Sequence, residues 1–166
     1  MLFKSKVLNK AFFILSAILI FTAAAYCGDA YNFELKDMKG DIVRLSDFKG
    51  KVIFLDFWAS WCPPCRHSMP AVKDLHKKYL SNPDVVILGI NAGEKQATVE
   101  KFIKKEGIEY TVLLGDNSVM QKYGVSGIPA FFIIDRNGNI AKRFVGYYGG
   151  VEKEWEKEIE FLLKQE

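Results

Sequence analysis

The sequence predicts an α/β fold in which helices cover both faces of a central mixed β-sheet. Short apolar runs of strand length alternate with segments whose apolar residues recur at helical spacing, from about residue 51 to residue 123. A hairpin and one more helix then complete the chain. This order of elements is typical of a layered α/β domain.

Three strands are predicted in the first part of the chain. Two short ones, at 31–35 and 42–45, lie around the turn Lys39-Gly40-Asp41. The third, at 51–57, is an unbroken apolar run rich in β-branched and aromatic residues, which indicates a buried central strand.

One strand and two helices follow. Helix 64–80 has apolar residues at helical spacing and prolines that suit a first turn. Pro70 lies inside it and is expected to kink it, because proline removes a backbone donor. The apolar run 84–90 predicts a strand. The segment 96–106 predicts a helix with one apolar face formed by Val99, Phe102 and Ile103.

The remaining elements are a strand at 110–114, a short helix at 118–123, a hairpin and a closing helix. The hairpin joins strands 130–135 and 140–145 about Asn137-Gly138, which is a strong turn signal. The closing helix, 151–163, has its inward-facing residues at helical spacing: Val151, Trp155, Ile159, Leu162 and Leu163.

Length and charge limit the function. A chain of 166 residues with 49% hydrophobic content supports one packed domain, placed at 31–165, and a short extension. The net charge of +3 arises at the N-terminus, where three lysines precede the first acidic residue, Asp29. Removing those three from the 23 basic residues leaves 20 against 20 acidic ones. The domain is therefore neutral, and nucleic acid is not expected as a partner.

Residues 1–27 have the order of a secretory signal: lysines, an apolar stretch, then small residues. We expect export, with the chain periplasmic or attached to the outer face of the cytoplasmic membrane. The apolar stretch is marginal for spanning a bilayer, so a cleaved signal peptide and an N-terminal membrane anchor both stay open. Cys27 stands where bacterial lipoproteins carry a lipid, although Tyr26 before it is not small; an idle cysteine is the alternative.

The chemistry centres on Cys62 and Cys65 in Trp61-Cys62-Pro63-Pro64-Cys65. Cys62 lies at a strand-to-helix turn, where free backbone N–H groups and the helix dipole favour a thiolate. We expect Cys62 to be the exposed nucleophile. Cys65, more buried, would resolve the mixed disulfide by forming a Cys62–Cys65 disulfide. No cofactor is expected. A zinc half-site is the alternative, but a second ligand pair would have to come from His67 and His76.

Asp56 stands inside the apolar strand before Cys62. Burial raises the pKa of a carboxyl, so we expect Asp56 to accept the proton of Cys65 through a water. A structural hydrogen bond at the end of the sheet is the alternative. Trp58 is expected in the core, and His67 is expected to be an exposed helix residue.

Substrate contacts are expected at Trp61, Pro63 and Pro64. Trp61 would shield Cys62 and offer an apolar surface to partners. Neither proline can donate an N–H to the Cys62 thiolate, which predicts a redox potential in the reducing half of the range for this chemistry.

These residues resemble the thioredoxin superfamily, and in particular its exported TlpA- and ResA-like branch. The run from Asp56 to Cys65 matches the active-site motif, and Gly127-Ile128-Pro129 matches the place where the family has a cis-proline facing the disulfide. Segments 45–51 and 91–114 are similar to the leading segment and the strand–helix insertion of the exported branch. The resemblance covers about 31–165 and implies a thioredoxin-like fold with an N-terminal β-hairpin.

The resemblance implies a thiol–disulfide oxidoreductase that reduces disulfides of exported proteins. A membrane thiol donor would supply the electrons, and apocytochrome c, hence cytochrome maturation, is one candidate target. A cis Ile128–Pro129 bond would leave the backbone of Ile128 free to pair with an extended substrate; a plain turn proline is the alternative. Two positions depart from the ResA type. That type has a glutamate where this chain has Ser68, and it tends to have a neutral residue where this chain has Asp56.

Two other functions stay open. A thiol peroxidase of the peroxiredoxin type would place a threonine three residues before the reactive cysteine, where this chain has Ala59. The second is a thioredoxin-fold binding module without turnover. The presence of both thiols, Asp56 and Pro129 argues against such an inactive site.

Overall fold

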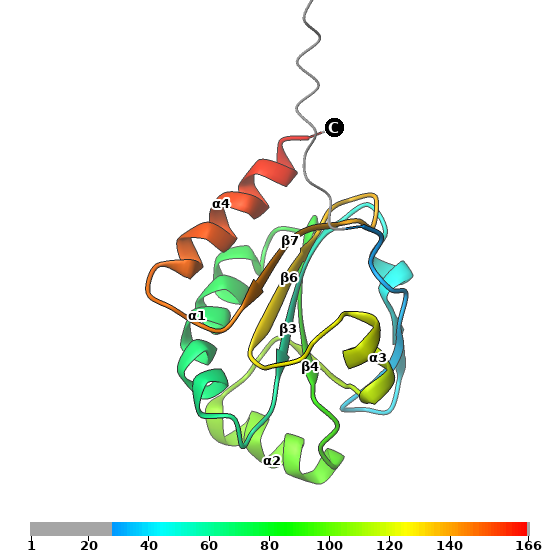
Figure 1. Ribbon diagram of the computed structural model, residues 1–166, viewed down its shortest axis with the longest axis vertical. Coiled ribbons are helices and arrows are strands. Elements are labelled where there is room, and N and C mark those ends of the chain that lie inside the picture. Colours follow the sequence, from blue (N-terminus) through cyan, green and yellow to red (C-terminus); the bar gives the residue numbers. More distant parts are fainter. Residues whose placement is uncertain (1–27, 166) are drawn as a thin grey trace, which may run out of the picture.

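A computed structural model describes residues 28–165 and contains one seven-stranded sheet (Figure 1). The predicted signal peptide or anchor at 1–27, with Cys27, lies outside the described residues. The strand order is β2-β1-β5-β4-β3-β6-β7. β3 pairs in parallel with β4, and β4 with β5, while the other neighbours are antiparallel, so the sheet is mixed as predicted. The strands are β1 Glu34–Asp37, β2 Ile42–Arg44, β3 Val52–Trp58, β4 Val85–Asn91, β5 Thr111–Leu114, β6 Ala130–Ile134 and β7 Ile140–Val145.

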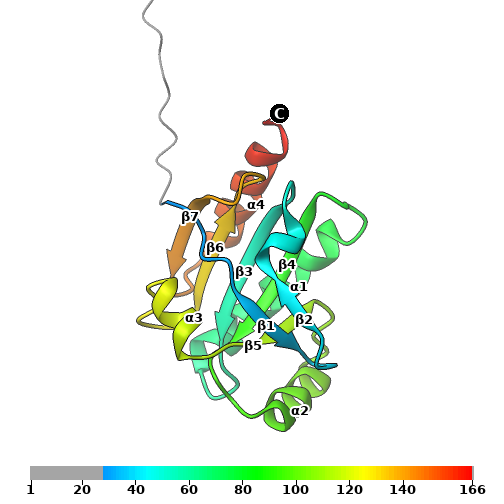
Figure 2. The same cartoon turned by 90° about the vertical axis from the view of Figure 1, so that its right-hand side faces the viewer.

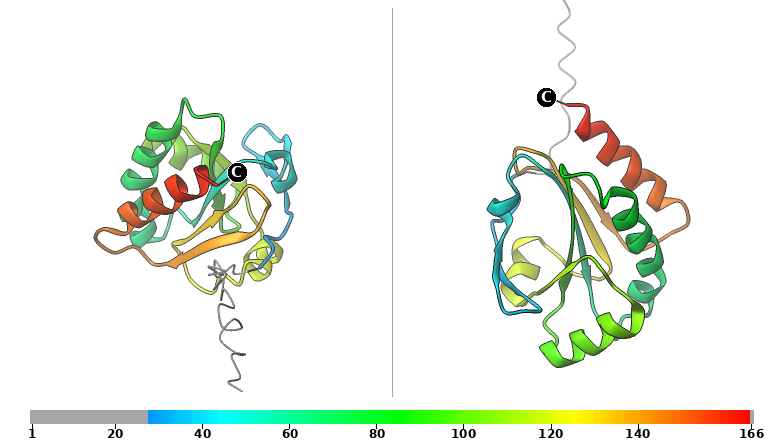
Figure 3. Two further views of the ribbon diagram at one scale, coloured as in Figure 1. Left: turned by 90° about the horizontal axis from the view of Figure 1, so that it is seen from above. Right: turned by 180° about the vertical axis from the view of Figure 1, so that it is seen from behind.

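Helices cover both faces of this sheet (Figure 3). Helices α1 (Pro63–Tyr79), α2 (Gln96–Glu106) and α4 (Val151–Leu163) bury their apolar sides against one face. The short helix α3 (Asn117–Lys122) and the 3-10 helix η1 (Leu45–Phe48) pack on the other. Two apolar clusters, one on each face, therefore hold the sheet between them.

β3 is the central strand, and all seven of its residues are buried. Its side chains alternate between the two apolar clusters, as the period of a strand requires. On the α1 face, the Trp155 ring packs against Phe54 and Phe131, with ring centroids 5.0 and 4.5 Å apart. This packing anchors α4 to the strand that leads into the two cysteines.

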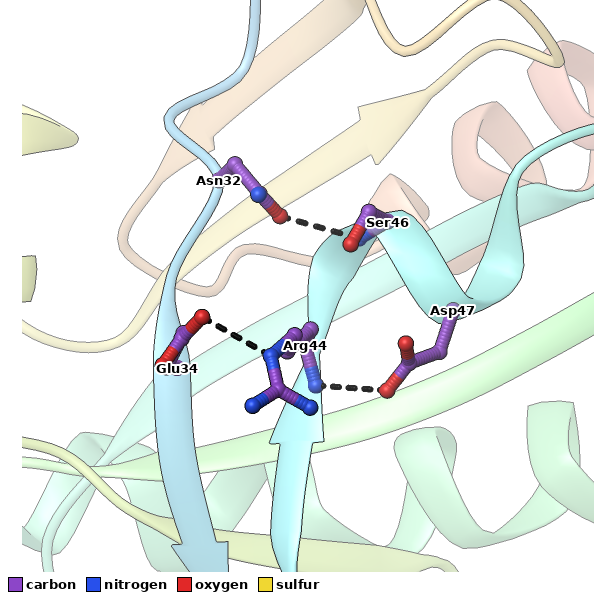
Figure 4. Close-up of polar contacts among 5 residues, drawn as sticks. All are labelled: Asn32, Glu34, Arg44, Ser46 and Asp47. Carbon is purple, nitrogen blue, oxygen red and sulfur yellow. Dashed lines mark hydrogen bonds and ion pairs between the residues drawn. The ribbon is translucent and has the colours of Figure 1, made fainter.

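The first strand differs from its prediction: it spans Glu34–Asp37 rather than 31–35. Residues 31–33 are tied down by other bonds. The Tyr31 carbonyl accepts from the Tyr123 hydroxyl. The Asn32 side chain accepts from the Ser46 amide (Figure 4). The ladder with β2 therefore begins at Glu34, whose carboxylate pairs with Arg44 at 2.8 Å (Figure 4). Figure 2 shows this hairpin at the sheet edge beside β5.

The other elements follow their predictions within one or two residues, and α2, β7 and α4 have the predicted bounds. Pro70 lies inside α1, which continues through it. Among residues 28–165, no helix is long and apolar enough to cross a bilayer.

Gly115→Ala is expected to destabilise the protein by about 2–3 kcal/mol, since overpacking against rigid backbone is costly. A Cβ at Gly115 would lie 2.5 Å from the backbone oxygen of Asn91 and 2.7 Å from the Ile90 side chain. Chemical denaturation measures the change. Gly149→Ala is the matched control, because nothing lies within 4 Å of a Cβ there. Equal stability of the two variants would contradict the close packing of Gly115.

Candidate active site

Cys62 is the N-cap of α1, in the turn that follows β3. Pro63 and Pro64 occupy the first helical positions and have no N–H, so the first amide of the helix that can reach back is that of Cys65. It donates to the Cys62 sulfur at 3.2 Å. The two sulfurs are bonded to each other, with Cα atoms 5.3 Å apart. The structure therefore contains the oxidised form of the pair.

The prediction that Cys62 is exposed is wrong. Cys62 is 3% exposed and Cys65 is 1% exposed, so both are buried. Cys62 turns its sulfur inward to cap the helix, and the carbonyl oxygen of Ile128 lies 3.7 Å from it. The exposed residue of the motif is Trp61, at 65%.

Cys62 helps to line an apolar hollow of about 410 Å³. The lining includes Trp61, Pro63 and Pro64 of the motif and the loop from Val125 to Ile128. Ala92 and Met120 complete the lining. The Ile128–Pro129 peptide bond is cis. The structure thus brings Trp61, Pro63, Pro64 and Ile128 together around Cys62, with Pro129 directly after Ile128.

Asp56 is 1% exposed and lies on the face of β3 that α1 covers. Burial raises the pKa of Asp56 to about 7, against a smaller lowering by a hydrogen bond from Tyr110. That hydroxyl donates to Oδ2 at 3.5 Å. Within the described part of the chain, Oδ1 is buried without a hydrogen-bond partner. At neutral pH this carboxyl can therefore exist in both protonation states.

The sequence pattern did not predict Glu94 as a residue of the site, although its side chain holds the turn before Cys62. It accepts the Ser60 amide and the Asn91 side chain, both at 2.7 Å, and also the Ser60 hydroxyl. Desolvation raises the pKa of Glu94, but the bonds from Ser60 and Asn91 outweigh it and hold the pKa below its ordinary value. The available signal was Asn91, a polar residue at the end of the apolar strand β4.

Other predicted residues lie away from the hollow. Trp58 is fully buried, and His67 is exposed, with its ring packed edge-on against Tyr147. Ser68 is buried and donates to the carbonyl of Cys65 at 2.9 Å. Across residues 28–165, no group of three or more His, Cys, Asp or Glu side chains could hold a metal ion.

Comparisons with known proteins agree with this geometry. The AhpC/TSA family matches residues 28–143, a span that includes both cysteines and the cis-proline. The thiol-disulfide oxidoreductase ResA of Geobacillus thermodenitrificans is 38% identical over 126 residues, covering 75% of this chain and 72% of the relative. ResA of Bacillus subtilis is 39% identical over 119 residues, covering 71% and 66%.

A solved structure shows a similar arrangement of elements. It is that of a candidate thiol:disulfide interchange protein DsbE from Chlorobium tepidum, with a TM-score of 0.74 and 35% identity. The alignment covers 81% of this chain and 95% of that one. The sheet and helices described above thus form a thioredoxin-like fold.

Asp56→Asn is expected to raise stability at alkaline pH. The pKa of Asp56 is about 7 in the folded protein against an ordinary 3.8, so between these values the folded state retains a proton that the unfolded state has released. The contribution of Asp56 to wild-type stability therefore falls as pH rises through this window and is level above it. The free energy of unfolding of the variant minus that of the wild type should therefore be larger at pH 8 than at pH 4, by roughly 2–4 kcal/mol.

Urea unfolding of the oxidised protein at both pH values measures this. Asp74→Asn, at an exposed position on α1, is the control and should show no such gain. A gain for Asp56→Asn that does not change with pH would contradict a buried, titrating carboxyl.

Proposed function

Since the chain belongs to the AhpC/TSA family and is a thiol–disulfide oxidoreductase, we propose that it reduces disulfides of exported proteins with the dithiol of Cys62 and Cys65. One observation carries the proposal. Cys62 lines an apolar hollow that Ile128 of the cis Ile128–Pro129 bond also lines, whereas Cys65 is buried and takes no part in that lining. Such a site admits a partner to the first sulfur and keeps the second for release.

The first step is attack by the Cys62 thiolate on a substrate disulfide. A bond forms between Cys62 and one substrate sulfur, and the other substrate sulfur leaves as a thiolate that takes up a proton. β6 begins at Ala130, so the backbone of Ile128 lies outside the ladder and can pair with an extended substrate as an added strand. Trp61 and the hollow offer apolar contacts to that segment.

The second step releases the product. Asp56, as a carboxylate, takes the proton of the Cys65 thiol, through a water. The Cys65 thiolate then attacks the Cys62 sulfur and forms the bond that the structure contains. The second substrate sulfur leaves as a thiolate and is protonated. Overall, two electrons and two protons pass from the protein dithiol to the substrate, and a membrane thiol donor restores the dithiol.

Reduction is the direction that the surroundings of Cys62 favour. A thiolate there accepts from the Cys65 amide, but Pro63 and Pro64 donate nothing, and the Ile128 carbonyl oxygen lies 3.7 Å away. A partial negative charge at that distance opposes an anionic sulfur. A poorly stabilised thiolate makes the dithiol the better reductant.

Export and the identity of the substrate rest on the sequence. Lysines followed by an apolar stretch support an exported protein that is periplasmic or anchored at its N-terminus. The similarity to ResA suggests apocytochrome c, and hence cytochrome maturation, as a substrate. Peroxide reduction has less support, because Ala59 offers no hydroxyl three residues before Cys62.

Cys65→Ser is expected to trap mixed disulfides, because Cys62 can still attack while the releasing thiol is gone. Non-reducing electrophoresis and mass spectrometry of captured periplasmic proteins measure the adducts. Cys62→Ser, the matched control, should trap none and should lose insulin reduction by on the order of 100-fold or more. Equal activity in wild type and Cys62→Ser would remove Cys62 from the reaction.

The redox potential of the Cys62–Cys65 pair is expected between about −270 and −195 mV, the reducing half of the known span. Equilibration with glutathione buffers, followed by counting of free thiols, gives the value. A potential near −120 mV, that of the strongly oxidising members, would overturn the assigned direction.

A further inference from the structure

We propose that Tyr110 is a positioning residue for the release step: its hydroxyl holds Oδ2 of Asp56 and leaves Oδ1 to receive the proton of Cys65. This inference rests on the proposed role of Asp56 as proton acceptor. Nothing in the sequence pattern marked Tyr110, which stands just before β5 and is two strands away from Asp56 in the sheet order.

Gly89, which has no side chain, makes room for the contact between Tyr110 and Asp56. In the ladder, Asp56 of β3 lies opposite Gly89 of β4, and Gly89 lies opposite Val112 of β5. A Cβ at Gly89 would approach the Tyr110 ring and the Trp58 indole nitrogen to 2.9 Å each. Glycine thus leaves a gap over β4 through which the Tyr110 ring reaches from β5 toward β3.

Tyr110 is the donor to Asp56 in the described part of the chain. Its hydroxyl lies 3.5 Å from Oδ2, and no other side chain or amide of residues 28–165 bonds to this carboxyl. A long hydrogen bond of this kind can tighten when a catalytic group becomes charged. The bond occupies one oxygen, so the lone pairs of the other are free for a proton.

The residues that pair with Asp56 in the sheet carry no charge. β4 contributes Gly89 and β6 contributes Phe131 as register partners of Asp56. On the same face, α1 contributes the buried Cys65, and the His76 ring of α1 packs against the Tyr110 ring with centroids 6.1 Å apart. The buried residues of α2 and α4 on this face are Val99, Phe102, Val151, Trp155, Ile159 and Leu162.

The hydroxyl acts on the equilibrium of Asp56 in one direction. A donor stabilises the carboxylate, which lowers the pKa of Asp56 against the effect of burial. The pKa of Tyr110 is raised, chiefly by burial and further by the charge and the hydrogen bond of Asp56. The phenol therefore keeps its proton and remains a donor across the pH range of the experiment. Without it, fewer molecules would have an ionised Asp56 at pH 7.

Tyr110→Phe tests the proposal, because it removes the hydroxyl and keeps the ring. The wild type and the variant, both with Cys65 intact, are reduced and mixed with an aromatic disulfide. Release of the aromatic thiol from Cys62 is then followed as a function of pH. We expect the midpoint of the rate to move up by about half to one pH unit, with a two- to fivefold slower release at pH 7. Above both midpoints the two rates should converge.

A direct titration accompanies the kinetics. Infrared difference spectra of the oxidised proteins, with Asp56→Asn as reference, report the protonation of Asp56 and should show the same upward shift. Tyr123→Phe is the matched control. It also removes the hydroxyl of a buried tyrosine, one that bonds to the Tyr31 carbonyl on the opposite face, and it should leave the midpoint unchanged.

The outcomes separate this inference from the proposed function. An unchanged midpoint in Tyr110→Phe, or a release slowed equally at every pH, overturns the role of Tyr110 alone, provided that Asp56→Asn slows release. If Asp56→Asn leaves the pH profile as it is, the proton-acceptor role of Asp56 falls, and the role of Tyr110 falls with it. In the double variant, Tyr110→Phe should add nothing to the effect of Asp56→Asn.

Discussion

The sulfur of Cys62 caps α1 through the amide of Cys65, because the two residues between them are prolines without an N–H. This one constraint sets the geometry of the reactive pair. It turns Cys62 inward and places Cys65 one helical turn later, within bonding distance. It also limits how well a Cys62 thiolate can be stabilised. The direction that we propose, reduction rather than oxidation, depends on the small number of hydrogen-bond donors that reach the Cys62 sulfur.

Three other segments of the fold hold the N-terminal end of α1 in place. β3, buried along its whole length, delivers the chain to the turn, and Glu94 holds the turn through Ser60. The loop before β6 brings the Ile128 carbonyl against the sulfur. The contacts come from segments far apart in the chain, so the site forms only when the sheet is complete. The hollow beside Cys62 is the route that we propose for a partner.

Burial of a carboxyl in the centre of the sheet is the energetic cost of the site. Asp56 is enclosed by apolar side chains, and its folded pKa of about 7 means that ionisation there opposes stability at neutral pH. Two features limit the cost: the hydroxyl of Tyr110 and the missing side chain of Gly89, which makes room for it. Neither lies near Asp56 in the sequence. The protein therefore combines a destabilising charge with a remote donor, a combination typical of functional sites.

The sequence alone was sufficient for the order of strands and helices along the chain, for the pairing of Cys62 with Cys65 and for the buried Asp56. These depend on local signals: apolar period, the prolines after Cys62 and a lone acid in an apolar run. It was wrong about the first strand, since Tyr31 and Asn32 bond to Tyr123 and Ser46 instead of to a neighbouring strand. It was wrong about the exposure of Cys62, and it passed over Glu94 and Tyr110. Those features depend on which distant segments meet across the sheet, and a hydrogen bond between residues 54 positions apart leaves no periodic trace in the chain. Tertiary structure alone decided them.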